Sequence, residues 1–351
     1  MPYCRRYPFI PVFLICALLF TSCGLLDQGD GEDTGPLEEH QNALPNLAAD
    51  STNIAYLEFD NGLRLPYYRT YDLNLKNTAV TAALIIVHGS GRGAFQLGID
   101  LADSAGVEAS TLIITPRFYP NWDEIPSDEP YWSTHGWKWG EESLTDAIRP
   151  GSISSFDPID RFIQQINNPE LFPSLTSITI AGHSAGGQFA HRYAVGNQVE
   201  QFLAGITVRY VISNPSTYVY IRPERALAGT LDEFEIPDVP DCGEYNSWPY
   251  GFDTSPPYYS GLTLTQIQNQ VRSRDMVYLA GDADTLITGS LDQSCGANYS
   301  GRNRYERSVI MKNLMDTFFA GHTHVLTVVP GVGHSGRSMF MSTRGLAALF
   351  N

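Results

Sequence analysis

The chain has 351 residues and is 43% hydrophobic, which is enough to bury a sizeable core. It holds 38 acidic and 22 basic side chains, giving a formal net charge of −16. This balance argues against binding to a phosphate backbone, which requires a basic face, so we expect no nucleic-acid partner.

The N-terminal segment is typical of an export signal. Two arginines precede an apolar stretch over residues 9–20, which is too short to span about 30 Å of bilayer hydrocarbon. Small residues precede Cys23, as in a bacterial lipobox. We expect a lipoprotein signal peptide over residues 1–22, with Cys23 bearing lipid such as palmitate and anchoring the protein to a bacterial cell-envelope membrane. The alternative is an ordinary secretory signal, and either one places the domain outside the cytoplasm.

The segment after Cys23 has the composition of a tether. Residues 25–50 include seven acidic side chains and no Lys or Arg, with Gly and Pro interspersed. Such a segment buries too little apolar surface to offset its ordering entropy. We therefore expect residues 23–50 to be an acidic flexible tether, followed by a single large domain over residues 51–351.

Apolar segments within residues 51–351 alternate between strand and helix character. Strands are predicted at Ala82–Val87, Thr111–Thr115, Ser177–Ala181, Arg209–Ser213, Met276–Ala280 and Val325–Val329, and helices at Asp160–Ile166, Gln188–Val195 and Val309–Phe319. Near-continuous apolar strands between helices predict an α/β fold with a mostly parallel sheet covered on both faces. In such sheets, functional residues gather at the carboxyl ends of the strands.

A Gly-His-Ser-Ala-Gly sequence over Gly182–Gly186 stands between a predicted strand and a predicted helix. In this context G-x-S-x-G predicts a nucleophile elbow, with Ser184 as the nucleophile. The glycines allow strand and helix to approach closely, and the first N–H groups of the helix face any anion that forms there.

An acid and a base are available past two later strands. His334 follows the last predicted strand and is the predicted base. Asp282 and Asp284 both follow the strand before it, and either can orient the histidine ring.

Two further histidines, His322 and His324, form an H-x-H pair that can hold a metal. They precede the last strand rather than follow it, so we expect no metal site there. The predicted chemistry needs no metal and no organic cofactor.

An oxyanion hole requires two donors that are already in place. The N–H of Ala185, next to the nucleophile, is the first predicted donor. The second is expected from the glycine-rich turn after His88, with Ser90 favoured over Gly91. His88 is expected to support that turn through hydrogen bonds.

These segments together resemble one known superfamily. The chain contains His88-Gly-Ser-Gly-Arg92, the serine elbow, Asn214-Pro-Ser-Thr-Tyr218, Gly281-Asp-Ala-Asp284 and Pro330-Gly-Val-Gly-His334. In this order they resemble the α/β-hydrolases from about residue 51 to the C-terminus, and within them the extracellular bacterial and fungal esterase-like hydrolases.

The resemblance implies an α/β-hydrolase fold and a triad of Ser184, Asp284 and His334. The acid of the superfamily stands three residues after the glycine, which favours Asp284 over Asp282. The implied activity is cleavage of a small-molecule or polymeric carboxylic ester through an acyl-enzyme. We expect the protein to be a monomer. A lipase, a thioesterase or a peptidase would use the same triad, and a non-catalytic ligand-binding lipoprotein on the same scaffold is an alternative of another class.

Two aromatic-rich regions follow strand ends, at residues 118–139 and 214–263. They are interpreted either as a substrate cleft with a lid insertion over 214–263, or as loops held together by their own aromatic packing. Cys242 and Cys295 remain after signal removal and lipidation, and in an oxidising compartment we expect them to form a disulfide rather than two buried free thiols.

Overall fold

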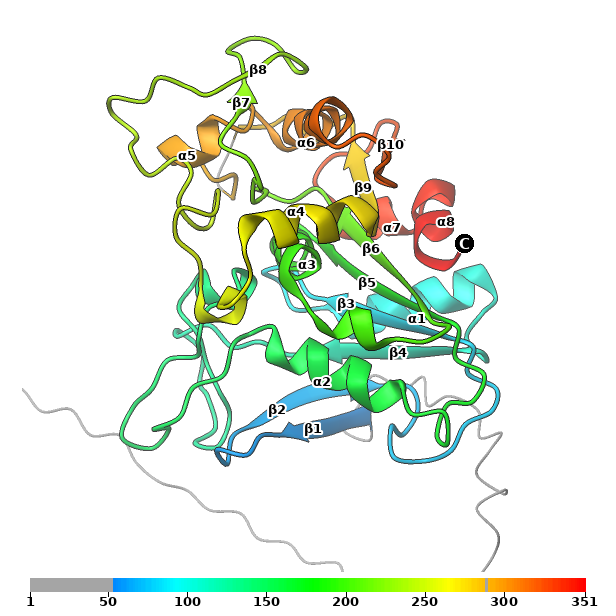
Figure 1. Ribbon diagram of the computed structural model, residues 1–351. Helices are drawn as coiled ribbons and strands as arrows, with labels where there is room; N and C mark the ends of the chain where they lie inside the picture. The colour runs from blue at the N-terminus through cyan, green and yellow to red at the C-terminus, as the bar shows by residue number, and fades with distance from the viewer. Residues whose placement is uncertain (1–52, 288–289) are drawn as a thin grey trace, which may run out of the picture. The chain divides into compact units, whose positions relative to one another are not determined.

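The computed structural model describes residues 53–287 and 290–351 (Figure 1). The expected signal peptide, Cys23 and the acidic tether lie outside these ranges. Within them, no helix combines the length and the apolar character that crossing a bilayer requires.

The described residues form one eight-stranded sheet in which β2 alone runs against its neighbours (Figure 1). The other neighbouring strands from β4 to β10 are parallel. All six predicted strands are present. In spatial order the sheet consists of β1 (Ile54–Glu58), β2 (Arg64–Arg69), β4 (Thr111–Pro116), β3 (Ala82–Val87), β5 (Ser177–His183), β6 (Thr207–Ser213), β9 (Asp275–Gly281) and β10 (Val325–Val329).

The central strands are apolar along their length because both faces of the sheet are buried. In β3, Ala83, Ile85 and Val87 belong to one hydrophobic cluster. Leu84 and Ile86, between them, belong to the cluster on the opposite face. Side chains of a strand alternate between faces, so a strand covered on both sides needs apolar residues at every position.

Helices cover the two faces of the sheet in separate sets (Figure 1). Side chains of α2, α3, α4 and α6 join one cluster, and those of α1, α7 and α8 join the other. The three predicted helices correspond to α2, α3 and α6. The bounds are α1 (Ala94–Ala105), α2 (Asp157–Ile166), α3 (Ala185–Gly196), α4 (Leu264–Ser273), α5 (Cys295–Asn298), α6 (Arg304–Phe318), α7 (Gly336–Phe340) and α8 (Thr343–Phe350).

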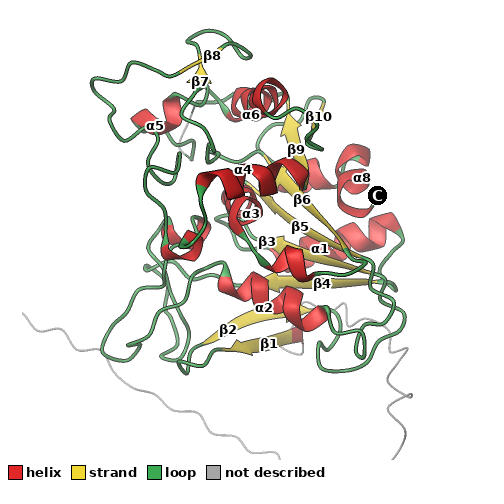
Figure 2. Ribbon diagram, in the orientation of Figure 1, coloured by secondary structure: helices red, strands yellow, loops and turns green. Residues whose placement is uncertain are grey.

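Two long segments consist mainly of loops, as Figure 2 shows. Residues 117–156 follow β4, and residues 214–263 follow β6 and include the two-residue strands β7 (Arg225–Ala226) and β8 (Phe234–Glu235). Most of their aromatic side chains are buried, among them Phe118, Trp132, Trp137, Tyr218, Tyr220, Tyr245 and Tyr259. Their burial favours the interpretation that these loops are held together by aromatic packing. Trp122 is an exception, because it is 59% exposed.

The segment 214–263 is fastened to the rest of the domain at several points. Arg192, on α3, is fully buried and donates from Nη2 to Oγ1 of Thr217 (2.9 Å) and to the carbonyl of Pro249 (2.8 Å). The predicted disulfide between Cys242 and Cys295 is present, with Cα atoms 5.9 Å apart, and ties the segment to α5.

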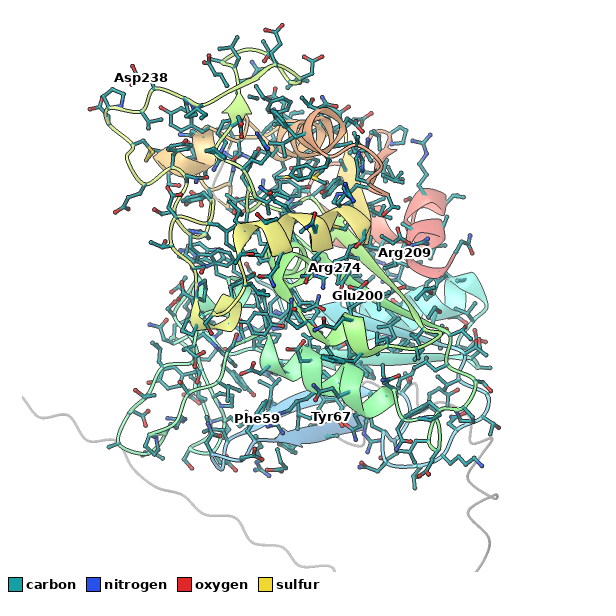
Figure 3. The ribbon with its side chains drawn as sticks, in the orientation of Figure 1. Phe59, Tyr67, Glu200, Arg209, Asp238 and Arg274 are labelled. Atoms are coloured by element: carbon teal, nitrogen blue, oxygen red, sulfur yellow. A yellow bond between two sulfur atoms is a disulfide. The ribbon has the colours of Figure 1, made fainter. Side chains whose placement is uncertain are left out.

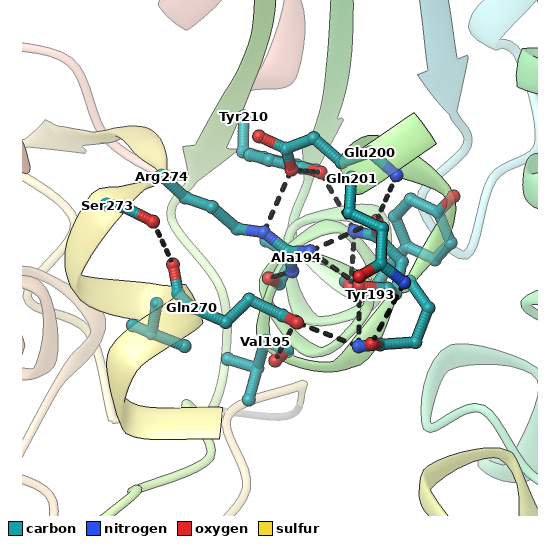
Figure 4. Close-up of polar contacts among 12 residues, drawn as sticks. Tyr193, Ala194, Val195, Glu200, Gln201, Tyr210, Gln270, Ser273 and Arg274 are labelled. Carbon is teal, nitrogen blue, oxygen red and sulfur yellow. Dashed lines mark hydrogen bonds and ion pairs between the residues drawn. The ribbon is translucent and has the colours of Figure 1, made fainter. Parts of the chain in front are cut away.

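A buried arginine also anchors the C-terminal end of α3 (Figures 3 and 4). Arg274 follows α4 and donates to the carbonyls of Ala194 and Asn197. Its Nε lies 2.8 Å from Oε2 of Glu200, which also accepts a hydrogen bond from the Tyr210 hydroxyl (2.7 Å). A cation at this end satisfies carbonyls that lack helical partners and complements the helix dipole.

Candidate active site

Ser184 lies at the turn between β5 and α3 and has strained backbone angles. Its φ is 58° and its ψ is −114°. A residue with a side chain pays about 1–3 kcal/mol for such a conformation. The Ser184 N–H donates to the carbonyl of Ser213 (2.9 Å), which ties the turn to the end of β6.

The glycines around Ser184 are required by close approaches of backbone. A Cβ on Gly182 would overlap the carbonyl of Gly186, and a Cβ on Gly186 would overlap the carbonyl of Val87. A Cβ on Gly187, which the motif does not include, would lie 2.7 Å from the carbonyl oxygen of Ser213. The sharp turn from strand to helix is therefore compatible only with glycine at these positions.

The structure brings together the three residues predicted to form a triad. Nε2 of His334 lies 3.0 Å from Oγ of Ser184, and Nδ1 lies 2.7 Å from Oδ2 of Asp284. Because a carboxylate only accepts, Nδ1 carries the proton and Nε2 is free to accept from the serine hydroxyl. Asp282 instead accepts a hydrogen bond from the N–H of Gly331 (2.6 Å) and does not reach the histidine.

The competing histidines are occupied elsewhere. Nε2 of His322 lies 2.9 Å from a carboxylate oxygen of Asp316, and the buried His324 accepts from the Tyr278 hydroxyl (2.8 Å). Across residues 53–287 and 290–351, no group of three or more His, Cys, Asp or Glu side chains is placed to hold a metal ion.

A buried arginine lies against the acid. Nη1 of Arg304, at the start of α6, is 3.7 Å from Oδ1 of Asp284, and the two side chains are 3% and 1% exposed. Nη2 of Arg304 donates to Oγ of Ser290 (2.9 Å). Burial lowers the pKa of Arg304, and the neighbouring Asp284 opposes that shift. Each oxygen of the Asp284 carboxylate therefore faces a separate positive or proton-donating group.

His183, inside the elbow motif, packs against the predicted base. Its ring centre lies 4.7 Å from that of His334, and its Nδ1 lies 3.1 Å from Oγ of Ser213. Burial, together with the nearby His334 and Arg304, lowers the pKa of His183 to about 3. His183 therefore stays neutral, and its packing limits the orientations open to the His334 ring.

Asn214 connects two of the strand ends that carry the site. It is fully buried with a φ of 40°. Its side-chain oxygen accepts from the N–H of Gly281 at the end of β9 (2.9 Å), and its Nδ2 donates to the carbonyl of Gly333 (3.5 Å), next to His334. This side chain holds the acid strand and the histidine loop in a fixed relation.

The turn after β3 is organised by His88. Its Nε2 accepts from the backbone N–H of Phe118 (3.0 Å), so Nδ1 carries the proton and donates to the carbonyl of Gly89 (2.8 Å). Burial lowers the pKa of His88 to about 4, which keeps the ring neutral. Since the C=O and N–H of a trans peptide point in opposite directions, the N–H of Ser90 points away from the His88 ring.

The two predicted donor regions lie against each other. Ala185 is the first residue of α3, and its N–H has no acceptor within the helix. The carbonyl of Val87 contacts Gly186, so the end of β3, which leads into the turn with Ser90 and Gly91, abuts the start of α3.

Three residues of the site, His183, Asn214 and Arg304, were not predicted. His183 lies in the serine elbow motif and Asn214 begins the Asn-Pro-Ser-Thr-Tyr motif, so the sequence did mark their positions as candidates. Arg304 has no such signal, because its contact with Asp284 arises only when α6 packs beside β9.

Comparisons with known proteins bear on the fold. No protein-family model matches the sequence, and no curated protein sequence matches it. Among solved structures, poly(aspartic acid) hydrolase-1 from Sphingomonas sp. KT-1 is similar, with a TM-score of 0.57 and 21% identity over 85% of this chain and 99% of that one. LpqC, a poly(3-hydroxybutyrate) depolymerase from Bordetella parapertussis, is similar with a TM-score of 0.56 and 20% identity over 82% and 86%. These similarities and the strand order show that the chain has the predicted α/β-hydrolase fold.

Proposed function

We propose that this protein is a serine hydrolase that cleaves carboxylic esters, with Ser184 as nucleophile, His334 as base and Asp284 as acid. One observation carries the proposal: the His334 ring bridges Oγ of Ser184 and the carboxylate of Asp284, at 3.0 and 2.7 Å. A binding module has no need for a strained serine within reach of a correctly oriented imidazole.

The reaction follows from the positions of these atoms. Nε2 of His334 accepts the proton of Ser184 as Oγ bonds to the ester carbonyl carbon, and the carbonyl oxygen becomes an oxyanion. The N–H groups of Ala185 and Ser90 donate to that oxyanion. His334 then gives its proton to the departing alkoxide as the C–O bond breaks, which leaves an acyl-enzyme. Water, deprotonated by the same nitrogen, attacks the acyl carbon, and Oγ recovers a proton as the carboxylic acid leaves.

The buried carboxylate of Asp284 supports this cycle without exchanging protons itself. It accepts from Nδ1 of His334 throughout and stabilises the imidazolium that forms after each proton transfer. Arg304 contacts Asp284, and Asn214 bonds to the segments that carry Asp284 and His334, so both help to hold the acid near the histidine.

We also propose that the domain works outside the cytoplasm, anchored through lipid on Cys23. The disulfide between Cys242 and Cys295 is consistent with an exported protein, because such bonds persist in oxidising compartments. Metabolic labelling of producing bacteria with radioactive palmitate, with Cys23→Ser as the matched variant, tests the anchor: the wild type should incorporate the label and Cys23→Ser should not, and equal labelling or no labelling of both would contradict it.

The substrate class is tested with a panel of esters. Two similar structures are named for hydrolysis of polymers, so the panel combines p-nitrophenyl esters of increasing chain length with polyester and aromatic ester substrates. A fluorophosphonate probe reports on the nucleophile independently of substrate. It should label the wild type and Ser273→Ala, an exposed serine far along α4, but not Ser184→Ala. Absence of labelling in the folded wild type would favour the ligand-binding alternative, and labelling with no ester cleaved would point to amide or thioester cleavage.

A further inference from the structure

A small cavity adjoins the proposed oxyanion donor Ser90. Its volume is about 90 Å³, and its lining includes Ser90, Trp122, His135, Trp137 and Lys138. The backbone N–H of Ser90 is proposed to donate to the reacting carbonyl oxygen of the substrate. A substrate held there can therefore place another of its chemical groups in this cavity.

Lys138 lines the cavity and is linked to α3 through the neighbouring Trp139. It ends a single 3₁₀ turn (Gly136–Lys138), and its Nζ lies 5.6 Å from the ring centre of Trp139. Nε1 of Trp139 donates to Oε1 of Gln188 (3.5 Å). Gln188 is one helical turn after Ser184, and its N–H donates to the Ser184 carbonyl.

Lys138 has no ion-pair partner among the described residues. The other cation in the cavity wall, Arg92, pairs with Asp123. Lys138 is partly buried, and this burial, together with the nearby Arg192 and against the opposing effect of Asp292, lowers its pKa to about 8. Burial of a cation without a partner is unfavourable, and an anionic ligand offsets that cost.

The charge of this cavity contrasts with the charge of the whole chain. The protein has a formal net charge of −16, which repels anionic molecules in general. Burial and the neighbouring Lys138 lower the pKa of His135, so that ring is largely neutral and able to donate a hydrogen bond near pH 7. Lys138 therefore supplies the unneutralised positive charge of the cavity.

We propose that this cavity binds a carboxylate carried by the ester substrate, with the ammonium of Lys138 as its counter-ion and Trp122 and Trp137 as apolar walls. The inference rests on the proposed esterase function and specifies its substrates. They are acidic esters, such as half-esters of dicarboxylic acids or polymer segments with free carboxylates. Lys138 is a specificity-determining residue and takes no part in the bond changes.

Matched ester pairs test the proposal. One pair is mono-p-nitrophenyl adipate and p-nitrophenyl hexanoate, which differ by an acyl-side carboxylate. The other is 4-acetoxybenzoate and 4-acetoxybenzamide, which differ on the alcohol side. The measured quantity is the ratio of kcat/KM for the acidic ester to that for the neutral ester. Lys138→Met should lower this ratio about tenfold in at least one pair, mainly through KM. Lys138→Arg should retain most of it, and Lys76→Met, at an exposed lysine, should match the wild type.

The pH dependence gives a second readout. The ratio for the wild type should fall above pH about 8 as Lys138 loses its proton, whereas it should stay flat in Lys138→Arg. His135, Arg192 and Asp292 are the charged or titratable groups that face Lys138, and His135→Gln should leave the fall in place. Equal ratios in the wild type and Lys138→Met for both pairs would overturn the proposal.

The experiment separates failure of this inference from failure of the esterase proposal. Suppose that the neutral esters are cleaved and the probe labels Ser184, but the kcat/KM ratios are the same in the wild type and Lys138→Met. Only the proposed carboxylate site is then wrong. If neither cleavage nor labelling occurs, titration calorimetry of adipate with Ser184→Ala protein still decides the site. Binding must weaken when Lys138→Met is added, and unchanged binding would reject it.

Discussion

The backbone of Ser184 predicts an unusual order of stability for two variants of the proposed nucleophile. Its angles, φ 58° and ψ −114°, match the first central position of a type II′ turn, where glycine dominates. Ser184→Ala keeps the Cβ and therefore the strain. Ser184→Gly removes the Cβ and relieves it.

The magnitude follows from two opposing contributions. Strain at such angles costs about 1–3 kcal/mol when a Cβ is present. Glycine gives the unfolded chain more freedom than alanine, which costs about 0.5–1 kcal/mol of stability. Both variants lose the hydrogen bond between Ser184 and His334, so that loss cancels in the comparison. Ser184→Gly should be more stable than Ser184→Ala by about 1 kcal/mol.

Urea titration at 25 °C and pH 7 measures the difference, provided that the two variants give equal m-values. Ala190→Gly in the middle of α3 is the control, because glycine there lies at helical angles and should destabilise by about 1 kcal/mol or more. The reasoning is refuted if Ser184→Ala is as stable as Ser184→Gly, since the turn would then carry no strain that a Cβ creates. Neither variant should react with a fluorophosphonate.

Three further predictions concern stability. The Cys242–Cys295 disulfide spans a sequence separation of 53, so replacing both by Ser should cost about 4 kcal/mol of unfolding free energy in urea; an unchanged midpoint would count against it. Arg274→Met leaves the carbonyls of Ala194 and Asn197 without their donor and the partly exposed Glu200 without its cation, so calorimetry should show a loss of about 1–3 kcal/mol, with a smaller loss in Arg274→Lys. Burial lowers the pKa of His88 from 6.5 to about 4, so the unfolded chain binds more protons between these values. The free energy of unfolding should therefore fall as pH drops from about 6.5 toward 4, and His88→Asn should make that fall shallower.

The central sheet could be predicted because its strands are buried on both faces. Segments such as Ala82–Val87 are apolar at every position, which is a strong local signal. The edge strand β1 and its neighbour β2 were not predicted. β1 is only partly buried and contains both exposed and apolar positions, so its pattern resembles that of a loop. It becomes a strand by pairing with β2, which no local pattern reveals.

The predicted triad lies together because each member follows the carboxyl end of a parallel strand. That rule needs only the strand positions and the residue types, both of which are local. The residues that contact the triad from other elements could be identified only from the folded structure. Arg304 reaches Asp284 from a helix, and Asn214 reaches the histidine loop across a neighbouring strand. These contacts depend on packing between segments that are distant in sequence.

The aromatic regions show a different limit of sequence analysis. Composition identified them but left open whether they form a cleft or pack on themselves. Tyr218 and Tyr259 are buried, whereas Trp122 is exposed, and this difference depends on which loop side chains face the core. Residue type alone carries no such information, because an aromatic ring suits a ligand pocket and a loop core equally well.

The strain at Ser184 persists only because the surroundings of the turn fix it from several sides. Its N–H is bonded to Ser213, and Gly186 is held against the carbonyl of Val87. At the far end of α3, Arg274 donates to the carbonyls of Ala194 and Asn197, and we expect these bonds to resist a shift of the helix that would relax the turn. A residue at the amino end of the sheet thus contributes to the geometry at its carboxyl end, so a change at Arg274 that loosens α3 should also reduce the stability gained in Ser184→Gly.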